Sequence, residues 1–298
     1  MKLSHESKVR LGVGIGAFVL IVGLVFGISR TLIHFDGPWD LDDVVSGLSG
    51  MDDVADEGDL LDDGNYSAQP QQLSSTTFDA DEFRYLDFDI NAASVDVKVV
   101  DGNKVRVIER GRVAKGVDAS KAATQNIASV KDSALKVSQF GSDDGKAIDR
   151  TVTVELPRHV AEHLKGINAH VGSGDLQIAG VICDGLDLFL GAGDVEFTGS
   201  VTDALSAEVG SGDVTFELYQ APTKSMDVSV DSGDVEIMVP NSTGFKASLT
   251  VGSGDFESDF LPLGYDGETI LNLEFDNGDK SATYRFKVGS GDMSFDSE

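Results

Sequence analysis

The chain has 298 residues, and its 34 glycines are too many for a bundle of long helices, in which glycine is unfavourable. Its formal net charge of −28 excludes nucleic acid as a partner, because phosphate binding requires surfaces rich in lysine and arginine. The single cysteine, Cys183, excludes an internal disulfide and any metal site built from several cysteines, and is expected to be a small buried hydrophobe.

The first predicted element is a transmembrane helix at residues 11–28, LGVGIGAFVLIVGLVFGI. These 18 residues include no charged residue and no proline, and as a helix of about 27 Å they can cross a thin hydrocarbon core. Three basic residues precede the span, at Lys2, Lys8 and Arg10. The positive-inside rule therefore predicts that residues 1–10 are cytoplasmic and that everything after the span is extracytoplasmic. A cleaved signal peptide is the alternative, although its apolar core is usually shorter, roughly 7 to 15 residues.

Residues 29–82 are predicted to form an acidic, disordered stalk. From Thr31 to Glu82 there are fourteen aspartates and glutamates and no lysine or arginine. Such a segment repels itself and cannot bury a core, so it is expected to act as a spacer between the membrane and the remaining residues.

A four-residue motif, GSGD in most copies, recurs through the rest of the chain and indicates a series of tight turns. Successive copies are separated by 19, 19, 21, 21 and 37 residues, and the last interval is close to two periods. Such a regular interval is typical of a repeat array. The copies begin at Gly172, Gly191, Gly210, Asp231, Gly252 and Gly289.

Strict alternation of apolar residues around each copy predicts two short strands flanking each turn. Around the third copy, for example, Leu205, Ala207 and Val209 precede the turn, and Val214 and Phe216 follow it. One repeat cannot bury this apolar side alone, but stacked coils about 4.8 Å apart produce a continuous core. The predicted fold is therefore all-β: a single-stranded parallel β-helix, or β-solenoid, with coils of 19–21 residues over residues 83–298, preceded by one transmembrane helix.

A degenerate early copy, NAAS at residues 91–94, suggests what the repeated aspartate does. Ser94 occupies the aspartate position. Serine and aspartate share little catalytic chemistry, but both accept a hydrogen bond from a backbone N–H, and the adjacent glycines permit positive φ. The pattern therefore predicts that the aspartate is a turn acceptor.

Two segments interrupt the array. Residues 118–130 are rich in alanine and are expected to form a short helix or a loop. In the 37-residue interval, Asn277-Gly278 lies between two alternating runs, which is a strong hairpin signal, so a hairpin is predicted there.

The repeat region of the chain resembles the bacterial putative-adhesin domain family of unknown function. The resemblance rests on the repeated GSGDVxF turns, the preceding single span, and the strand ends VELP and IMVP at Pro157 and Pro240. It covers residues 83–298 and implies a β-solenoid displayed at the cell envelope. It brings no established catalytic or ligand residue. The chain departs from a regular array at residues 91–94 and 252–289.

Histidines offer one alternative chemistry. HVAEH, from His159 to His163, matches the H-x-x-E-H pattern of a zinc peptidase family, which requires both histidines on one helical face. Pro157 and the extended sequence that follows leave room for at most two helical turns, so a loop is predicted instead. His170 alternates with apolar neighbours and is expected to point outward.

The turn aspartates offer a second alternative chemistry, which is cation binding. In stacked coils they would form a line of carboxylates about 4.8 Å apart, which repel one another unless donors or cations intervene. Structural calcium is one solution, but the nine-residue repeat of calcium β-rolls differs from this period. Backbone N–H groups and the turn serines, Ser173, Ser211, Ser232, Ser253 and Ser290, are the favoured alternative. The calcium candidates are Asp175, Asp194, Asp213, Asp234, Asp255 and Asp292, and no other cofactor is expected.

No pair of nucleophile and base stands out, so the sequence predicts a non-enzymatic scaffold or adhesin-like binding module of the bacterial cell envelope. Its expected partners are the membrane, through residues 11–28, and an envelope protein or polysaccharide. An enzyme acting on cell-wall polysaccharide is the competing class and would need an aromatic and acidic cluster on one strand face. The outward positions Gln177, Glu196, Thr215 and Glu236 are scattered in type instead.

Overall fold

The computed structural model describes residues 65–139, 145–261, 273–279 and 281–297. These residues belong to one unit, Asp62–Glu298. The predicted cytoplasmic segment, the span at residues 11–28 and most of the predicted stalk lie outside the described residues. Among the residues that are described, no helix is long and apolar enough to cross a membrane.

The described unit consists almost entirely of strands, which join into one 18-stranded sheet. The first part of the chain contains β1 (Gln71–Asp79), the 3-10 turn η3 (Ala80–Glu82), β2 (Tyr85–Ala92), β3 (Ser94–Val100), β4 (Lys104–Val113), α3 (Ala119–Ala122), β5 (Ala128–Lys131), β6 (Ala134–Gln139), β7 (Ala147–Pro157) and α4 (Arg158–Ala161). The repeats contain β8 (Leu164–Ser173), β9 (Leu176–Ala192), β10 (Val195–Ser211), β11 (Val214–Gln220), β12 (Ser225–Ser232), β13 (Val235–Val239), β14 (Phe245–Ser253), β15 (Phe256–Glu257), β16 (Leu273–Asn277), β17 (Ala282–Ser290) and β18 (Met293–Ser297).

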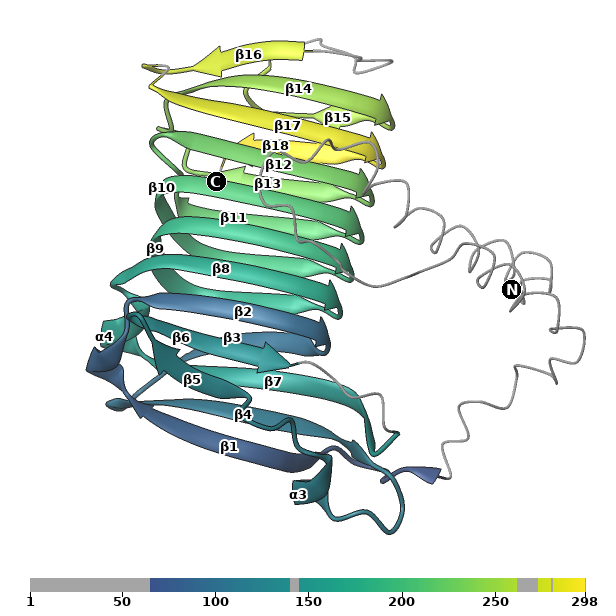
Figure 1. Ribbon diagram of the computed structural model, residues 1–298. Helices are drawn as coiled ribbons and strands as arrows, with labels where there is room; N and C mark the ends of the chain where they lie inside the picture. The colour runs from purple at the N-terminus through teal and green to yellow at the C-terminus, as the bar shows by residue number, and fades with distance from the viewer. Residues whose placement is uncertain (1–64, 140–144, 262–272, 280, 298) are drawn as a thin grey trace, which may run out of the picture. The chain divides into compact units, whose positions relative to one another are not determined.

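Each GSGD turn joins two faces of a flattened coil (Figure 1). Segments before the turns pair in parallel with one another, and so do segments after them. The register aligns equivalent residues, such as Leu205 with Leu186 and Phe216 with Phe197. Because side chains alternate along a strand, these residues all point between the two faces, where they are buried. The prediction of a mostly β, largely parallel architecture is confirmed.

The coils do not stack in chain order at the C-terminal end. Strand β17 pairs in parallel with β12 on one side and with β14 on the other. Strand β18 likewise lies between β13 and β15. The last coil of the chain is therefore inserted between the two coils that precede it, as Figure 1 shows for β17 and β18.

The predicted hairpin around Asn277-Gly278 is wrong. Strand β16 pairs antiparallel with β14, whereas β17 lies on the opposite side of β14. Strand β14 offers β16 apolar partners, and Phe275 makes an edge-to-face contact with Phe245 at 5.8 Å. The Asn277 side chain donates to the carbonyl of Thr243 at 2.8 Å. This bond holds the last residue of β16 next to the residues that precede β14.

The N-terminal end repeats this arrangement. Strand β2 lies between β6 and β8, and β3 lies between β7 and β9, so an early coil is also inserted inside the stack. Strand β4 pairs antiparallel with both β7 and β1. The predicted end of the stalk at residue 82 is therefore too late, since β1 belongs to the sheet. Residues 64–78 contain no acidic residue and carry several threonines and serines, which suits a strand.

A buried ion pair joins the N-terminal strands. The Glu109 carboxylate on β4 is fully buried and accepts from Arg150 at 2.7 Å. It also accepts from the Thr124 backbone N–H at 2.8 Å and the Thr124 hydroxyl at 2.6 Å. With several donors around it, the buried charge is compensated and ties β4, β7 and the segment after α3 together.

Candidate functional site

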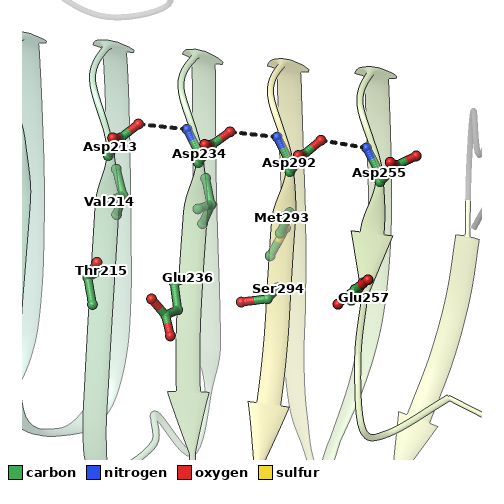
Figure 2. A pocket seen from close by; sticks show the side chains of 11 residues that line it. Asp213, Val214, Thr215, Asp234, Glu236, Asp255, Glu257, Asp292, Met293 and Ser294 are labelled. Atoms are coloured by element: carbon green, nitrogen blue, oxygen red, sulfur yellow. Dashed lines mark hydrogen bonds between the residues drawn. The ribbon is translucent and has the colours of Figure 1, made fainter.

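The structure brings the six candidate aspartates into one line along the edge where the coils turn. The order along the line follows the stacking of the coils, with Ser94 at the start: Ser94, Asp175, Asp194, Asp213, Asp234, Asp292 and Asp255. We call this line the aspartate ladder. Figure 2 shows its last four members standing side by side.

Every ladder carboxylate except that of Asp255, the last in the line, accepts a hydrogen bond from the backbone N–H of the aspartate in the next coil. The N–O distance is 3.0 Å from Asp234 to Asp213 and 2.9 Å from Asp292 to Asp234. The Ser94 hydroxyl accepts in the same way from Asp175, at 3.3 Å. The predicted role as backbone acceptor is confirmed, but the donor comes from the neighbouring coil and not from the same turn.

The turn serines do not supply the predicted donors. Among the described residues, no hydrogen bond joins a hydroxyl of these serines to a ladder carboxylate. The Ser253 and Ser290 hydroxyls instead lie 3.4 Å from each other. Serines in neighbouring coils stand beside one another, while the aspartate side chains point along the stack to the next backbone.

The glycine before each aspartate meets two requirements. Gly212 has φ +137°, which side chains rarely adopt. A Cβ at Gly212 would also overlap the carbonyl oxygen of Gly193 in the adjacent coil. The predicted positive φ is confirmed, and close stacking of the turns excludes a side chain independently.

The ladder borders a shallow depression of about 470 Å³ on the strands that follow the turns. Thr215, Glu236, Ser294 and Glu257 line it below the aspartates (Figure 2). Its carboxylates make it acidic. In the described part of the chain, however, no three histidine, cysteine or acidic side chains are placed to hold a metal ion. Calcium binding at the ladder stays a prediction.

The other predicted positions are structural. Helix α4 ends at Ala161, so His159 and His163 do not share a helical face, and the Nδ1 of His163 lies 3.0 Å from the His159 carbonyl. A single helical turn therefore stands where a loop was predicted, and it is too short for the zinc pattern. Cys183 is buried as predicted, and burial, with a smaller effect from Asp184, raises the pKa of its thiol to about 12.

Sequence reasoning missed a group of exposed aromatic residues on the strands that precede the turns. Tyr85 is 42% exposed and Phe189 is 38% exposed. His170 points outward as predicted, and its ring stacks on Phe189 with centroids 4.6 Å apart. The sequence contains a signal that could have found them, because Tyr85 and Phe189 occupy outward positions in the apolar alternation of β2 and β9.

A family model for the toastrack DUF4097 domain matches residues 75–296. The chain belongs to the toastrack DUF4097 family. The resemblance to bacterial putative adhesins is thereby confirmed, and the matched segment starts within β1, before the predicted boundary at residue 83. A comparison with curated proteins gave no match.

Several solved structures are similar to this toastrack protein. A protein of Clostridium sporogenes described as a putative cell adhesion protein is 13% identical, with a TM-score of 0.48, covering 77% of this chain and 100% of its own. A putative adhesin of Bacteroides fragilis is 15% identical, with a TM-score of 0.41, covering 77% of this chain and 98% of its own. A putative adhesin of Parabacteroides merdae is 10% identical, with a TM-score of 0.33, covering 77% of this chain and 97% of its own.

Proposed function

We propose that this toastrack protein is a membrane-tethered, non-catalytic binding module of the bacterial cell envelope. Residues 11–28 anchor it, residues 1–10 are cytoplasmic, and the coils face outward from the cell. The coil-to-coil hydrogen bonding of the aspartate ladder carries this proposal. The most regular acidic feature of the chain holds turns together, which is the task of a scaffold and not of a catalytic centre.

The outward side chains supply the surface that such a scaffold presents. Equivalent positions on neighbouring strands form rows across the coils, for example Asp87, Asn168 and Asp187 on β2, β8 and β9. A row can change residue by residue without disturbing the core, because alternate residues face opposite sides of a strand. The partner proposed for this surface is an envelope polysaccharide or protein.

The chemistry of the one thiol supports a non-catalytic role. A nucleophilic cysteine needs an accessible thiolate. Cys183 is fully buried, and its raised pKa keeps the thiol protonated at neutral pH.

Protease treatment of intact cells tests the tether and the orientation. We expect external protease to remove the coils and leave a small membrane-bound fragment, because the basic residues precede the span. A cytoplasmic protein that stays intact is the control for cell integrity. Full protection of the coils in intact cells, with digestion after permeabilisation, would overturn the orientation. A mature N-terminus near Arg30 would show that residues 11–28 are a cleaved signal peptide.

A further inference from the structure

The ring of Tyr85 lies beside bare backbone on the outer face of the strands before the turns. Tyr85 on β2 pairs with Gly166 on β8, which pairs with Gly185 on β9. A Cβ added at Gly166 would lie 3.1 Å from Cδ1 of Tyr85, so the ring packs directly against this glycine. No side chain from either glycine position covers the ring, and Tyr85 as a residue is 42% exposed.

A second ring is fixed on the same face. Phe189 lies four residues after Gly185 on β9, and its ring stacks on His170 of β8 with an interplanar angle of 20°. Stacking restricts how the Phe189 ring can rotate. Phe189 nevertheless remains 38% exposed, so its side chain can contact a ligand without first rearranging.

Polar groups lie between the two rings. By register, Asn168 on β8 lies midway on the diagonal from Tyr85 to Phe189, and Asp187 on β9 is directly opposite Asn168. Four residues of rise and two strand spacings place the Cα atoms of the two aromatics about 16 Å apart. Asn168 and Asp187 are exposed, and within the described residues no hydrogen bond to their side chains is found. The amide offers donors and an acceptor, and the carboxylate offers acceptors.

We propose that these five residues, Tyr85, Asn168, His170, Asp187 and Phe189, form a binding strip for an uncharged polysaccharide. The proposal rests on the binding function proposed above and names its ligand class. Flat apolar rings suit the C–H faces of sugars, and an amide and a carboxylate between them suit sugar hydroxyls. The 16 Å separation, roughly estimated from strand geometry, is a span that a short oligosaccharide covers.

Charge argues against an anionic polymer. The carboxylates of Asp87, Asp89, Asp187 and Glu208 lie on or beside the strip. Two neighbouring cations are already engaged, since Lys136 pairs with Asp87 at 3.1 Å and Lys165 pairs with Asp184 at 2.7 Å. A phosphate- or uronate-rich chain would therefore be repelled.

The form of the surface argues against a protein partner. Protein interfaces are centred on well-packed, desolvated apolar clusters. Here the two rings are separated by polar positions, and they do not form a continuous apolar patch. Separate rings with hydroxyl-binding groups between them fit a sugar chain better.

The experiment measures binding of neutral hexasaccharides, namely cellohexaose, chitohexaose and mannohexaose, to the full-length protein in detergent micelles by calorimetry. An oligomer of galacturonic acid is the anionic comparison. We expect at least one neutral hexasaccharide to bind, and Tyr85→Ala and Phe189→Ala each to weaken it by about tenfold or more. Tyr85→Phe should retain most of the affinity, because the ring is kept.

Tyr219→Ala is the matched control, since Tyr219 is 53% exposed but lies on β11, outside the strip. It should leave binding unchanged, and the melting temperatures of all variants should match that of the wild type. Absence of binding to all three neutral hexasaccharides, equal loss with Tyr219→Ala, or stronger binding of the galacturonate would overturn the strip. Hydrolysis of a bound hexasaccharide would leave the strip standing and overturn the non-catalytic function, so the two failures are distinguishable.

Discussion

Gly212 and Asp213 are neighbours in one turn, but they place different demands on substitution. The Asp213 side chain is exposed and supplies one acceptor oxygen to the next coil, at 3.0 Å from the Asp234 nitrogen. Gly212 has both a positive φ and the backbone of the adjacent coil against it. The turn therefore tolerates a changed side chain at residue 213 far better than an added one at residue 212.

Gly212→Ala is predicted to destabilise the fold by about 3 kcal/mol or more, because backbone strain and overlap with Gly193 act together. Gly102→Ala is the matched control, since Gly102 has the same φ of +137° but nothing within 4 Å of an added Cβ. It should cost only about 1 kcal/mol. Denaturant unfolding of both variants measures the difference. Equal destabilisation would show that the close approach of neighbouring coils contributes nothing.

The acceptor role of the aspartate could be predicted from the sequence because Ser94 replaces it in one copy. The backbone N–H that donates to the aspartate could not be predicted from the sequence. Within an isolated turn, the N–H of the same loop is the obvious partner, and only stacking brings the Asp234 N–H to the Asp213 carboxylate. The glycine requirement could be predicted from positive φ and from the stacking of the turns, although the atom that an added Cβ would meet, the Gly193 carbonyl oxygen, needs the three-dimensional arrangement.

At the scale of elements, insertion of a coil at each end determines which strands are edges. Strand β17 is close to the C-terminus of the chain, but it is hydrogen-bonded on both sides, by β12 and β14. Strand β16 occurs earlier in the chain and pairs only with β14 among the described strands. Protection from solvent should therefore follow position in the stack and not position in the sequence.

Amide hydrogen exchange tests this order. The amides of β17 should exchange as slowly as those of β12, because both strands lie inside the stack, whereas β16 should exchange faster by local fraying. The inner strand β12 serves as the internal reference. Fast exchange in β17 together with slow exchange in β14 and β16 would indicate coils stacked in chain order and contradict the insertion.

Coil order lies beyond sequence reasoning for a physical reason. Every copy has the same alternation and the same turn, so any coil can pack on any other with its apolar residues in register. The hairpin at Asn277-Gly278 failed for a related reason, since β14 carries the same alternation as β17 and it is β14 that pairs with β16. Alternation did predict the strands and their buried faces, which depend on local pattern alone.

For the whole molecule, the central question is how the stack holds like charges in line. The chain carries a formal net charge of −28, and six of its carboxylates form the aspartate ladder. The backbone N–H groups that donate to these carboxylates bring positive partial charge between the coils and offset part of the repulsion. We therefore expect the stack to form without a bound cation, and this expectation separates a scaffold from a calcium-dependent repeat domain.

The most direct measurement is the melting temperature of the full-length protein, recorded with calcium and with a chelator for wild type and Asp213→Asn. We expect the same wild-type melting temperature in both conditions. We also expect a change of no more than about 2–4 °C for Asp213→Asn, because the amide oxygen accepts the same N–H and one repulsive charge is removed. A chelator that lowers the wild-type melting temperature by several degrees or more, together with severe destabilisation by Asp213→Asn, would show that the ladder binds calcium and would contradict the account.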